Sequence, residues 1–188
     1  EAFAETGGYP LGLHFDRNGQ LIAAVKSVGL VAIDRQGKVT LLADRAGDTP
    51  ILYADELDIA SDGSIYFSDG STKFEWGWPF DTLEGRPYGR LLRYNPATQK
   101  TDVLLDGLYF ANGILLSPKE DYLLITESPR YRIIRYWLQG DKAGTTEPFA
   151  ENLPILPDNL SIDHEGDIWV GGSKRSALLD RLQRHAFL

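Results

Sequence analysis

The stretch ELDIASDGSIYFS, residues 56–68, joins two apolar strands through a tight polar turn. The chain repeats this pattern three more times, as GLHFDRNGQLIAA at residues 12–24, GILLSPKEDYLLIT at residues 113–126 and NLSIDHEGDIWVG at residues 159–171. The turn glycines of the first two copies, Gly19 and Gly63, lie 44 positions apart. Repeats of this length with several strands each are typical of β-propellers. The sequence therefore predicts an all-β propeller, in which equivalent residues of different blades meet around one central channel.

The repeats divide the chain into blades of one propeller domain that takes in residues 1–188. We expect three complete blades at residues 9–45, 51–106 and 109–152, and an incomplete fourth blade at residues 155–188. About three and a half blades leave strand edges unpaired, which is unfavourable in water. We therefore expect flanking sequence or a second chain to close the ring.

Residues 71–90 form an insertion between two strands of the second blade, and aromatic residues are concentrated in it. Long loops in compact domains often serve as lids or binding loops. In one interpretation, Trp76 and Trp78 form an aromatic wall at the channel mouth and contact an apolar substrate. In the other, these rings cover the flank of their own blade, and the sequence favours neither. Helical periodicity is weak throughout the chain, and only residues 177–182 form a candidate helix.

The composition excludes several classes of function. The net charge of -8 argues against nucleic acid or an anionic membrane surface as a partner. The chain contains no Cys, so it has neither a disulfide framework nor a cysteine nucleophile. No apolar run reaches the roughly 18 residues that span a bilayer. The compartment is left open between a periplasmic location and a membrane anchor in a segment preceding this chain.

One position of the repeat carries polar side chains where the first strand of a blade begins. Eight residues before the turn residue, the four copies hold Leu11, Asp55, Asn112 and Asp158. Burying a carboxylate without a partner is costly, and Ca²⁺ binds 6–8 oxygen ligands that include Asp and Asn side chains. We therefore predict a shared Ca²⁺ site in the channel. The alternative, that each residue only forms a turn with its own backbone, is left open.

Several short motifs resemble those of the strictosidine synthase-like proteins: FANGI at residues 110–114, LSP at 116–118, RYW at 135–137, KAG at 142–144 and PDNL at 157–160. This group includes the adipocyte plasma membrane-associated proteins and is similar to the gluconolactonase, regucalcin and paraoxonase propellers. The resemblance implies a six-bladed propeller with Ca²⁺ in its channel and, in many members, hydrolysis of lactones or aryl esters. By motif, Asn112 and Asp158 match metal ligands of the family, and Asp55 and Asn159 match further residues of the metal site.

The chain departs from this family pattern in two ways. The family's glutamate ligand comes from a blade that would precede this chain. Paraoxonases have a catalytic histidine at the position of Leu11, so their histidine mechanism does not transfer. The glutamate with which strictosidine synthases condense an amine and an aldehyde lies in a blade that would follow this chain.

Our leading interpretation is a Ca²⁺-dependent hydrolase whose partner is a small lactone or aryl ester. The metal polarises the substrate carbonyl and stabilises the oxyanion. Asp158 is the candidate general base, and Asp55 or Glu56 orients substrate or water. The first alternative is a non-catalytic binding or scaffold propeller with a structural Ca²⁺. The second is an amine–aldehyde condensing enzyme of the strictosidine synthase type.

Overall fold

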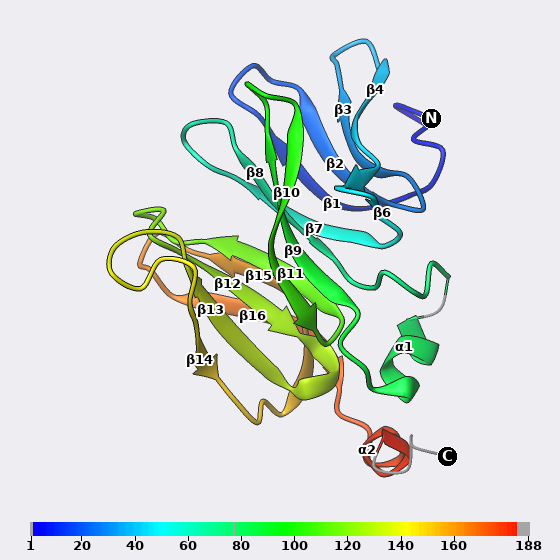
Figure 1. Ribbon diagram of the computed structural model, residues 1–188, viewed down its shortest axis with the longest axis vertical. Helices are drawn as coiled ribbons and strands as arrows, with labels where there is room; N and C mark the ends of the chain where they lie inside the picture. The colour runs from blue at the N-terminus through cyan, green and yellow to red at the C-terminus, as the bar shows by residue number, and fades with distance from the viewer. Residues whose placement is uncertain (1, 77, 184–188) are drawn as a thin grey trace.

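The computed structural model describes residues 2–76 and 78–183, and antiparallel sheets make up most of it (Figure 1). Three sheets have four strands each, which pair in chain order. The first holds β1 (Tyr9–Phe15), β2 (Leu21–Lys26), β3 (Gly29–Ile33) and β4 (Val39–Ala43). The second holds β7 (Ala54–Ile59), β8 (Ile65–Asp69), β9 (Gly89–Asn95) and β10 (Lys100–Leu108). The third holds β11 (Ala111–Leu116), β12 (Tyr122–Glu127), β13 (Arg132–Trp137) and β14 (Thr146–Ala150). The two-stranded hairpin of β15 (Ile155–Ile162) and β16 (Ile168–Lys174) follows.

The remaining elements are short. They are the small hairpin of β5 (Arg45–Ala46) and β6 (Thr49–Pro50), the 3₁₀ turn η1 (Ser128–Arg130), and the helices α1 (Trp78–Glu84) and α2 (Ala177–Gln183). Among the residues that the structure describes, no helix is long and apolar enough to cross a bilayer.

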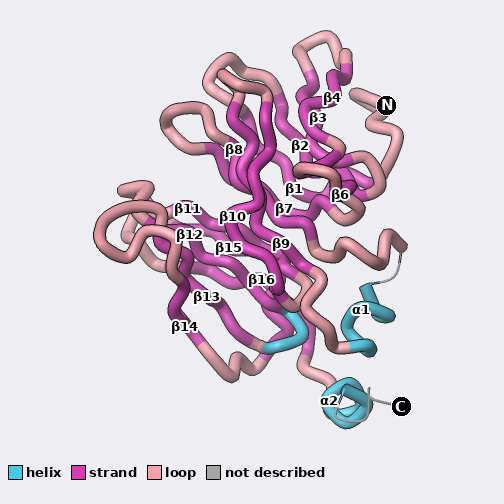
Figure 2. The backbone as a smooth tube through the Cα atoms, viewed as in Figure 1, coloured by secondary structure: helices cyan, strands magenta, loops and turns pink. Residues whose placement is uncertain are grey.

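The predicted propeller fold is confirmed by how the sheets follow one another (Figure 2). The first strands of consecutive sheets lie against each other: β1 contacts β7, β7 contacts β11, and β11 contacts β15. Inner strands of propeller blades line the central channel in this way. Within the described ranges the blades form an open arc, and no sheet closes it into a ring.

Apolar residues fill the spaces between consecutive blades. Ile22 and Leu30 of the first blade pack in one cluster with Leu57 and Phe67 of the second. Alternate residues of a strand point to opposite faces of a sheet, so each blade can pack against two neighbours. Corresponding clusters lie between the second and third blades and between the third blade and the β15–β16 hairpin. The channel residues are thus positioned by packing between blades.

The hairpin turns explain why the repeat is so regular. Asp16 Oδ1 accepts hydrogen bonds from the N–H groups of Asn18 and Gln20 at 2.9 and 2.8 Å, and Gly19 has a φ of +76°. In the third blade Glu120 adopts the left-handed conformation, with a φ of +56°. Its carboxylate accepts hydrogen bonds from the Ser61 N–H at 2.6 Å and the Ser61 hydroxyl at 2.8 Å. This contact joins the second and third blades, which compensates for backbone strain at a non-glycine residue.

The insertion contains a helix that the periodicity did not predict. Helix α1 occupies residues 78–84 and contacts α2, which coincides with the weak helical pattern at the end of the chain (Figure 1). Pro79 is the second residue of α1, where a missing N–H costs nothing. Asp81 lies in the first turn, where the helix dipole favours a carboxylate. A helix of two turns is too short to show a reliable period, so the sequence pattern does not predict it.

Candidate metal centre

Each blade interrupts its first strand at the repeat position that carries the polar residues. The pairing of β7 with β8 shifts register between Ala54 and Leu57, which leaves Asp55 within the irregularity. The β11–β12 pairing shifts at the equivalent place around Asn112, and β1 and β15 have the same irregularity. A bulge leaves its residues outside the ladder and redirects their side chains. The repeat therefore aims one side chain per blade away from the sheet.

A cavity of about 230 Å³ lies where these interrupted strands meet. Asp55 from β7, Asn112 from β11 and Asp158 from β15 all line it, together with Leu11 from β1. Trp78 reaches the cavity from α1. Residues separated by more than forty positions in the sequence thus line one cavity.

Three of the predicted site residues lie outside the described lining of this cavity. Glu56 is half-buried, and its Oε1 accepts a hydrogen bond from the Leu57 N–H at 3.0 Å. Asn159 directly follows Asp158 in β15, and it is exposed. Trp76 also lies outside it, since its ring packs edge to face on Tyr9 with centroids 5.3 Å apart. Of the two tryptophans, Trp78 is the one that contributes a wall to the cavity.

Further cavity residues were not predicted from the repeat: Tyr53, Phe110, Ser128, Leu156, Pro157 and Ser173. Tyr53 and Phe110 pack edge to face with centroids 5.0 Å apart, and each stands two positions before a predicted ligand. Burial, with the charges of Asp55 and Asp158, raises the pKa of Tyr53 to about 12, so this phenol stays neutral. An apolar or aromatic residue two positions before a predicted ligand is the sequence signal that could have identified Tyr53 and Phe110.

Asp55 lies close enough to other carboxylates for their charges to disfavour its ionisation. Burial holds the pKa of Asp55 well above its usual range, and the charges of Asp158 and Glu56 act in the same direction. The Lys26 ammonium acts in the opposite direction. Burial also raises the pKa of Asp158, although a hydrogen bond from the Asn112 amide lowers it. A cation among these carboxylates would relieve this repulsion.

The donor set fits a calcium ion. Asn112 is buried, and its side-chain oxygen Oδ1 has no hydrogen-bond partner among the described residues. A buried polar atom left in this state costs free energy unless a ligand or ion satisfies it. Asn112 lines the same cavity as Asp55 and Asp158, and all three side chains carry oxygen donors of the kind that Ca²⁺ prefers. In the described part of the chain, no cluster of three His, Cys, Asp or Glu side chains could hold a metal. The candidate site therefore depends on the asparagine.

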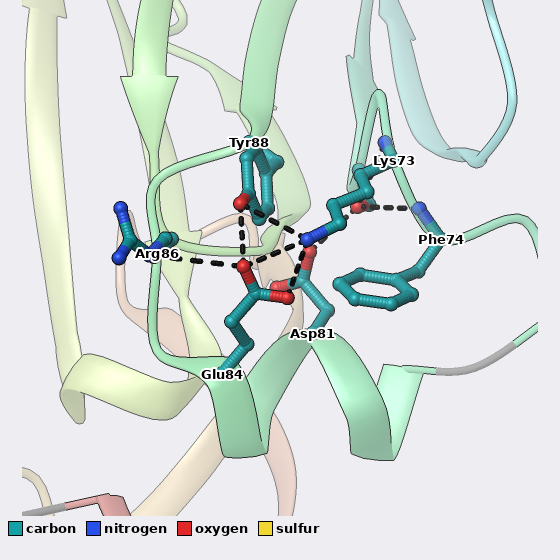
Figure 3. Close-up of polar contacts among 7 residues, drawn as sticks. Lys73, Phe74, Asp81, Glu84, Arg86 and Tyr88 are labelled. Carbon is teal, nitrogen blue, oxygen red and sulfur yellow. Dashed lines mark hydrogen bonds and ion pairs between the residues drawn. The ribbon is translucent and has the colours of Figure 1, made fainter. Parts of the chain in front are cut away.

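The insertion is held in place by a polar network around α1 (Figure 3). Lys73 Nζ lies 2.7 Å from Glu84 Oε2, and the Tyr88 hydroxyl donates to Glu84 Oε1 at 2.6 Å. The Ser71 hydroxyl donates to Asp81 Oδ2 at 2.6 Å. These contacts connect both ends of the insertion to the helix that carries Trp78. The helix that contributes Trp78 to the cavity wall is therefore held in place by polar contacts.

Comparisons of the fold identify the class of protein. The chain superposes on a gluconolactonase from Xanthomonas campestris with a TM-score of 0.76 at 20% identity, covering 92% of this chain and 59% of that structure. It superposes on regucalcin from Agrobacterium tumefaciens, a calcium-binding protein, with a TM-score of 0.65 at 18% identity, covering 87% and 53%. Both comparisons show the fold alone, a β-propeller of the gluconolactonase and regucalcin type.

Sequence comparisons place the chain more narrowly. Residues 55–141 match the family model of strictosidine synthase. Strictosidine synthase-like protein 13 of Arabidopsis thaliana is 44% identical over 87% of this chain and 41% of its own length. The rat adipocyte plasma membrane-associated protein is 37% identical over 89% of this chain and 46% of its own length. The chain is therefore a relative of these proteins, which confirms the resemblance seen in its motifs. It spans less than half the length of these relatives.

Proposed function

We propose that this chain forms part of the channel wall of a Ca²⁺-dependent hydrolase that acts on lactones or aryl esters. The observation that carries the proposal is that Asn112, whose buried Oδ1 has no described partner, lines one cavity with Asp55 and Asp158. Similarity of fold to a gluconolactonase and to calcium-binding regucalcin supports the same class of activity. The chemistry that a bound Ca²⁺ supplies is polarisation of the substrate carbonyl.

Asp158 is the residue that we assign as general base. It is exposed to solvent at the cavity, so a water molecule can reach its carboxylate. A carboxylate has two oxygens, so Asp158 can contribute one to the cation and accept a proton with the other. A water proton passes to Asp158 while the hydroxide oxygen bonds the acyl carbon. The acyl C–O bond then breaks, and the proton goes to the leaving oxygen.

The other cavity residues bind and orient the substrate. Trp78 lines the cavity with an aromatic side chain, and Tyr53 lines it with a phenol that stays neutral. Asp55 is buried at the same cavity and is better placed than Glu56 to orient a water or a substrate hydroxyl. Such a cavity, mostly apolar with a few converging polar groups, is typical of small-molecule sites.

The test is hydrolysis of a panel of lactones and aryl esters by the intact protein, with Ca²⁺ and after chelation. We expect turnover that chelation abolishes and that Asp158→Asn lowers strongly. Asp163→Asn, the same change in the exposed turn of the same hairpin, is the matched control and should keep full activity. Turnover that survives chelation unchanged would contradict the proposal.

A second candidate function is a scaffold or binding propeller in which Ca²⁺ has only a structural role. The observation in its favour is that the three donors come from three consecutive blades, β7, β11 and β15. A cation held by them would link these blades together. In that case chelation lowers the melting temperature of the protein, and no ester or lactone in the panel is hydrolysed.

A further inference from the structure

Two buried hydroxyl groups occupy the same position in neighbouring blades. Ser68 in β8 and Thr126 in β12 are both fully buried. Ser68 precedes Asp69, which pairs with Ala54, and Thr126 precedes Glu127, which pairs with the equivalent residue of β11. The two hydroxyls therefore lie on the second strand of their blades, next to the interrupted part of the first strand.

Each hydroxyl accepts a hydrogen bond from its own blade. The Ser68 Oγ accepts from the N–H of Glu56 at 3.0 Å, and the Thr126 Oγ1 accepts from the N–H of Gly113 at 2.7 Å. Glu56 and Gly113 directly follow the candidate ligands of these two blades. The hydroxyls thus satisfy backbone groups that the irregular register leaves outside the ladder.

Each hydroxyl donates its one hydrogen across the junction to the next blade. Ser68 Oγ lies 2.6 Å from the backbone carbonyl oxygen of Asn112, and Thr126 Oγ1 lies 2.8 Å from that of Asp158. The acceptors are the candidate ligands themselves. The first blade has Ala24 at the equivalent position, so the junction that leads to Asp55 lacks a hydroxyl there.

We propose that Ser68 and Thr126 are positioning residues for the cation site, which hold Asn112 and Asp158 at the distance and orientation that binding requires. This inference rests on the proposed function, because it assumes that Asn112 and Asp158 bind Ca²⁺. The hydroxyls do not touch the ion. They fix the backbone of each ligand, while the Asn112 side-chain oxygen is left free to bind. The ligand atoms of one ion must be positioned to within a few tenths of an ångström. A shift of one blade relative to the next therefore weakens the whole site.

The experiment measures Ca²⁺ affinity of the intact protein by calorimetric titration, independently of any catalytic activity. Thr126→Val removes the hydroxyl and keeps the branched shape, and Ser68→Ala removes a single oxygen atom at the other junction. We expect each variant to bind Ca²⁺ about 10- to 100-fold more weakly, as is typical when a partner that orients a metal ligand is lost. Thr126→Ser restores the hydroxyl and should recover most of the affinity.

Ser117→Ala is the control for a general loss of stability. Ser117 is also buried, and its hydroxyl donates to Asp121 at 2.6 Å in the turn between β11 and β12, away from the cavity. We expect this variant to melt at a lower temperature and to bind Ca²⁺ like the wild type. If Thr126→Val does not fold, Ser68→Ala and Thr126→Ser still provide the comparison.

The outcomes separate this inference from the proposed function. Wild-type affinity in Ser68→Ala or Thr126→Val, in a protein that binds Ca²⁺, overturns the positioning role and leaves the cation site standing. Equal loss of affinity in Ser117→Ala overturns it as well, because the effect is then one of stability. A wild-type protein that does not bind Ca²⁺ overturns the proposed function, and the inference with it.

Discussion

Asp69 and Arg90 form a buried ion pair, and Asp69 contacts the backbone of a residue that lines the candidate metal centre. Arg90 Nη2 donates to Asp69 Oδ2 at 2.6 Å, and the two side chains are 7% and 0% exposed. Asp69 Oδ1 accepts a hydrogen bond from the N–H of Tyr53, which lines the cavity. The third blade repeats this arrangement, with Glu127 accepting from a backbone N–H and pairing with Arg132. In these two blades a carboxylate at the end of the second strand, β8 or β12, thus anchors the segment that leads into the channel.

Asp69→Asn should destabilise the protein strongly. The change keeps the shape of the side chain but leaves the Arg90 charge buried without its counter-ion, which typically costs about 3–5 kcal/mol. Urea unfolding of the intact protein measures the loss. Asp102→Asn is the matched control, because the Arg93–Asp102 pair is largely exposed and should lose less than about 1 kcal/mol. Similar losses in both variants would show that burial of the pair does not matter.

Gly113→Ala should push the third and fourth blades apart. A Cβ at this position would lie 2.3 Å from the carbonyl oxygen of Asp158, a backbone atom that cannot move aside. We expect a loss of stability of about 1–3 kcal/mol, as for other overpacked sites, together with weaker Ca²⁺ binding. At Gly171 the nearest described atom to an added Cβ is 3.7 Å away, so Gly171→Ala is the control and should leave both measurements unchanged.

Loss of a ligand should weaken Ca²⁺ binding in a way that loss of an apolar neighbour does not. Asn112→Ala and Asp158→Ala each remove an oxygen donor from the cavity, and we expect at least the roughly tenfold loss that follows removal of an outer partner. Leu11→Ala alters the same cavity without removing an oxygen and should bind normally. Calorimetric titration compares the three variants, and equal affinity in all of them argues against the site.

The free energy of unfolding of the protein should depend on pH through Asp81, which lies in the insertion. Burial raises the pKa of Asp81 to about 6, from 3.8 in the unfolded chain, although the Ser71 hydroxyl opposes the shift. Between these two values the folded state binds more protons, so its free energy of unfolding falls as the pH rises from about 4 to about 6. The difference amounts to something on the order of 3 kcal/mol. Urea unfolding across this range should show a flatter profile for Asp81→Asn than for the wild type.

Trp78 should contribute to substrate binding if the chain belongs to a hydrolase. Trp78→Ala removes an aromatic wall of the cavity, so we expect a higher KM for aryl esters with a smaller effect on kcat. Phe80→Ala provides a control on the same helix, because Phe80 is 65% exposed and lies outside the described lining of the cavity. A parallel rise of KM in both variants would instead indicate that the whole helix has moved.

The fold and part of the site could be predicted from the sequence because a propeller repeats its pattern. Turn residues such as Gly19 and Gly63 set the register of each hairpin, and that register identified Asp55, Asn112 and Asp158 as equivalent. The structure brings these three residues to one cavity. The helix in the insertion could not be predicted, because α1 interrupts the repeat and is too short to show a period of its own.

The architecture and the equivalence of positions in the blades follow from the sequence alone, since hydrophobic alternation and turn chemistry are local properties of the chain. Which side chains meet depends on how the blades pack together. The interrupted register of β7 and β11 aims Asp55 and Asn112 into the cavity, and packing between blades brings the Ser68 hydroxyl to the Asn112 carbonyl. Such contacts join residues more than forty positions apart, and their energies depend on burial and distance, which arise only when the blades pack together.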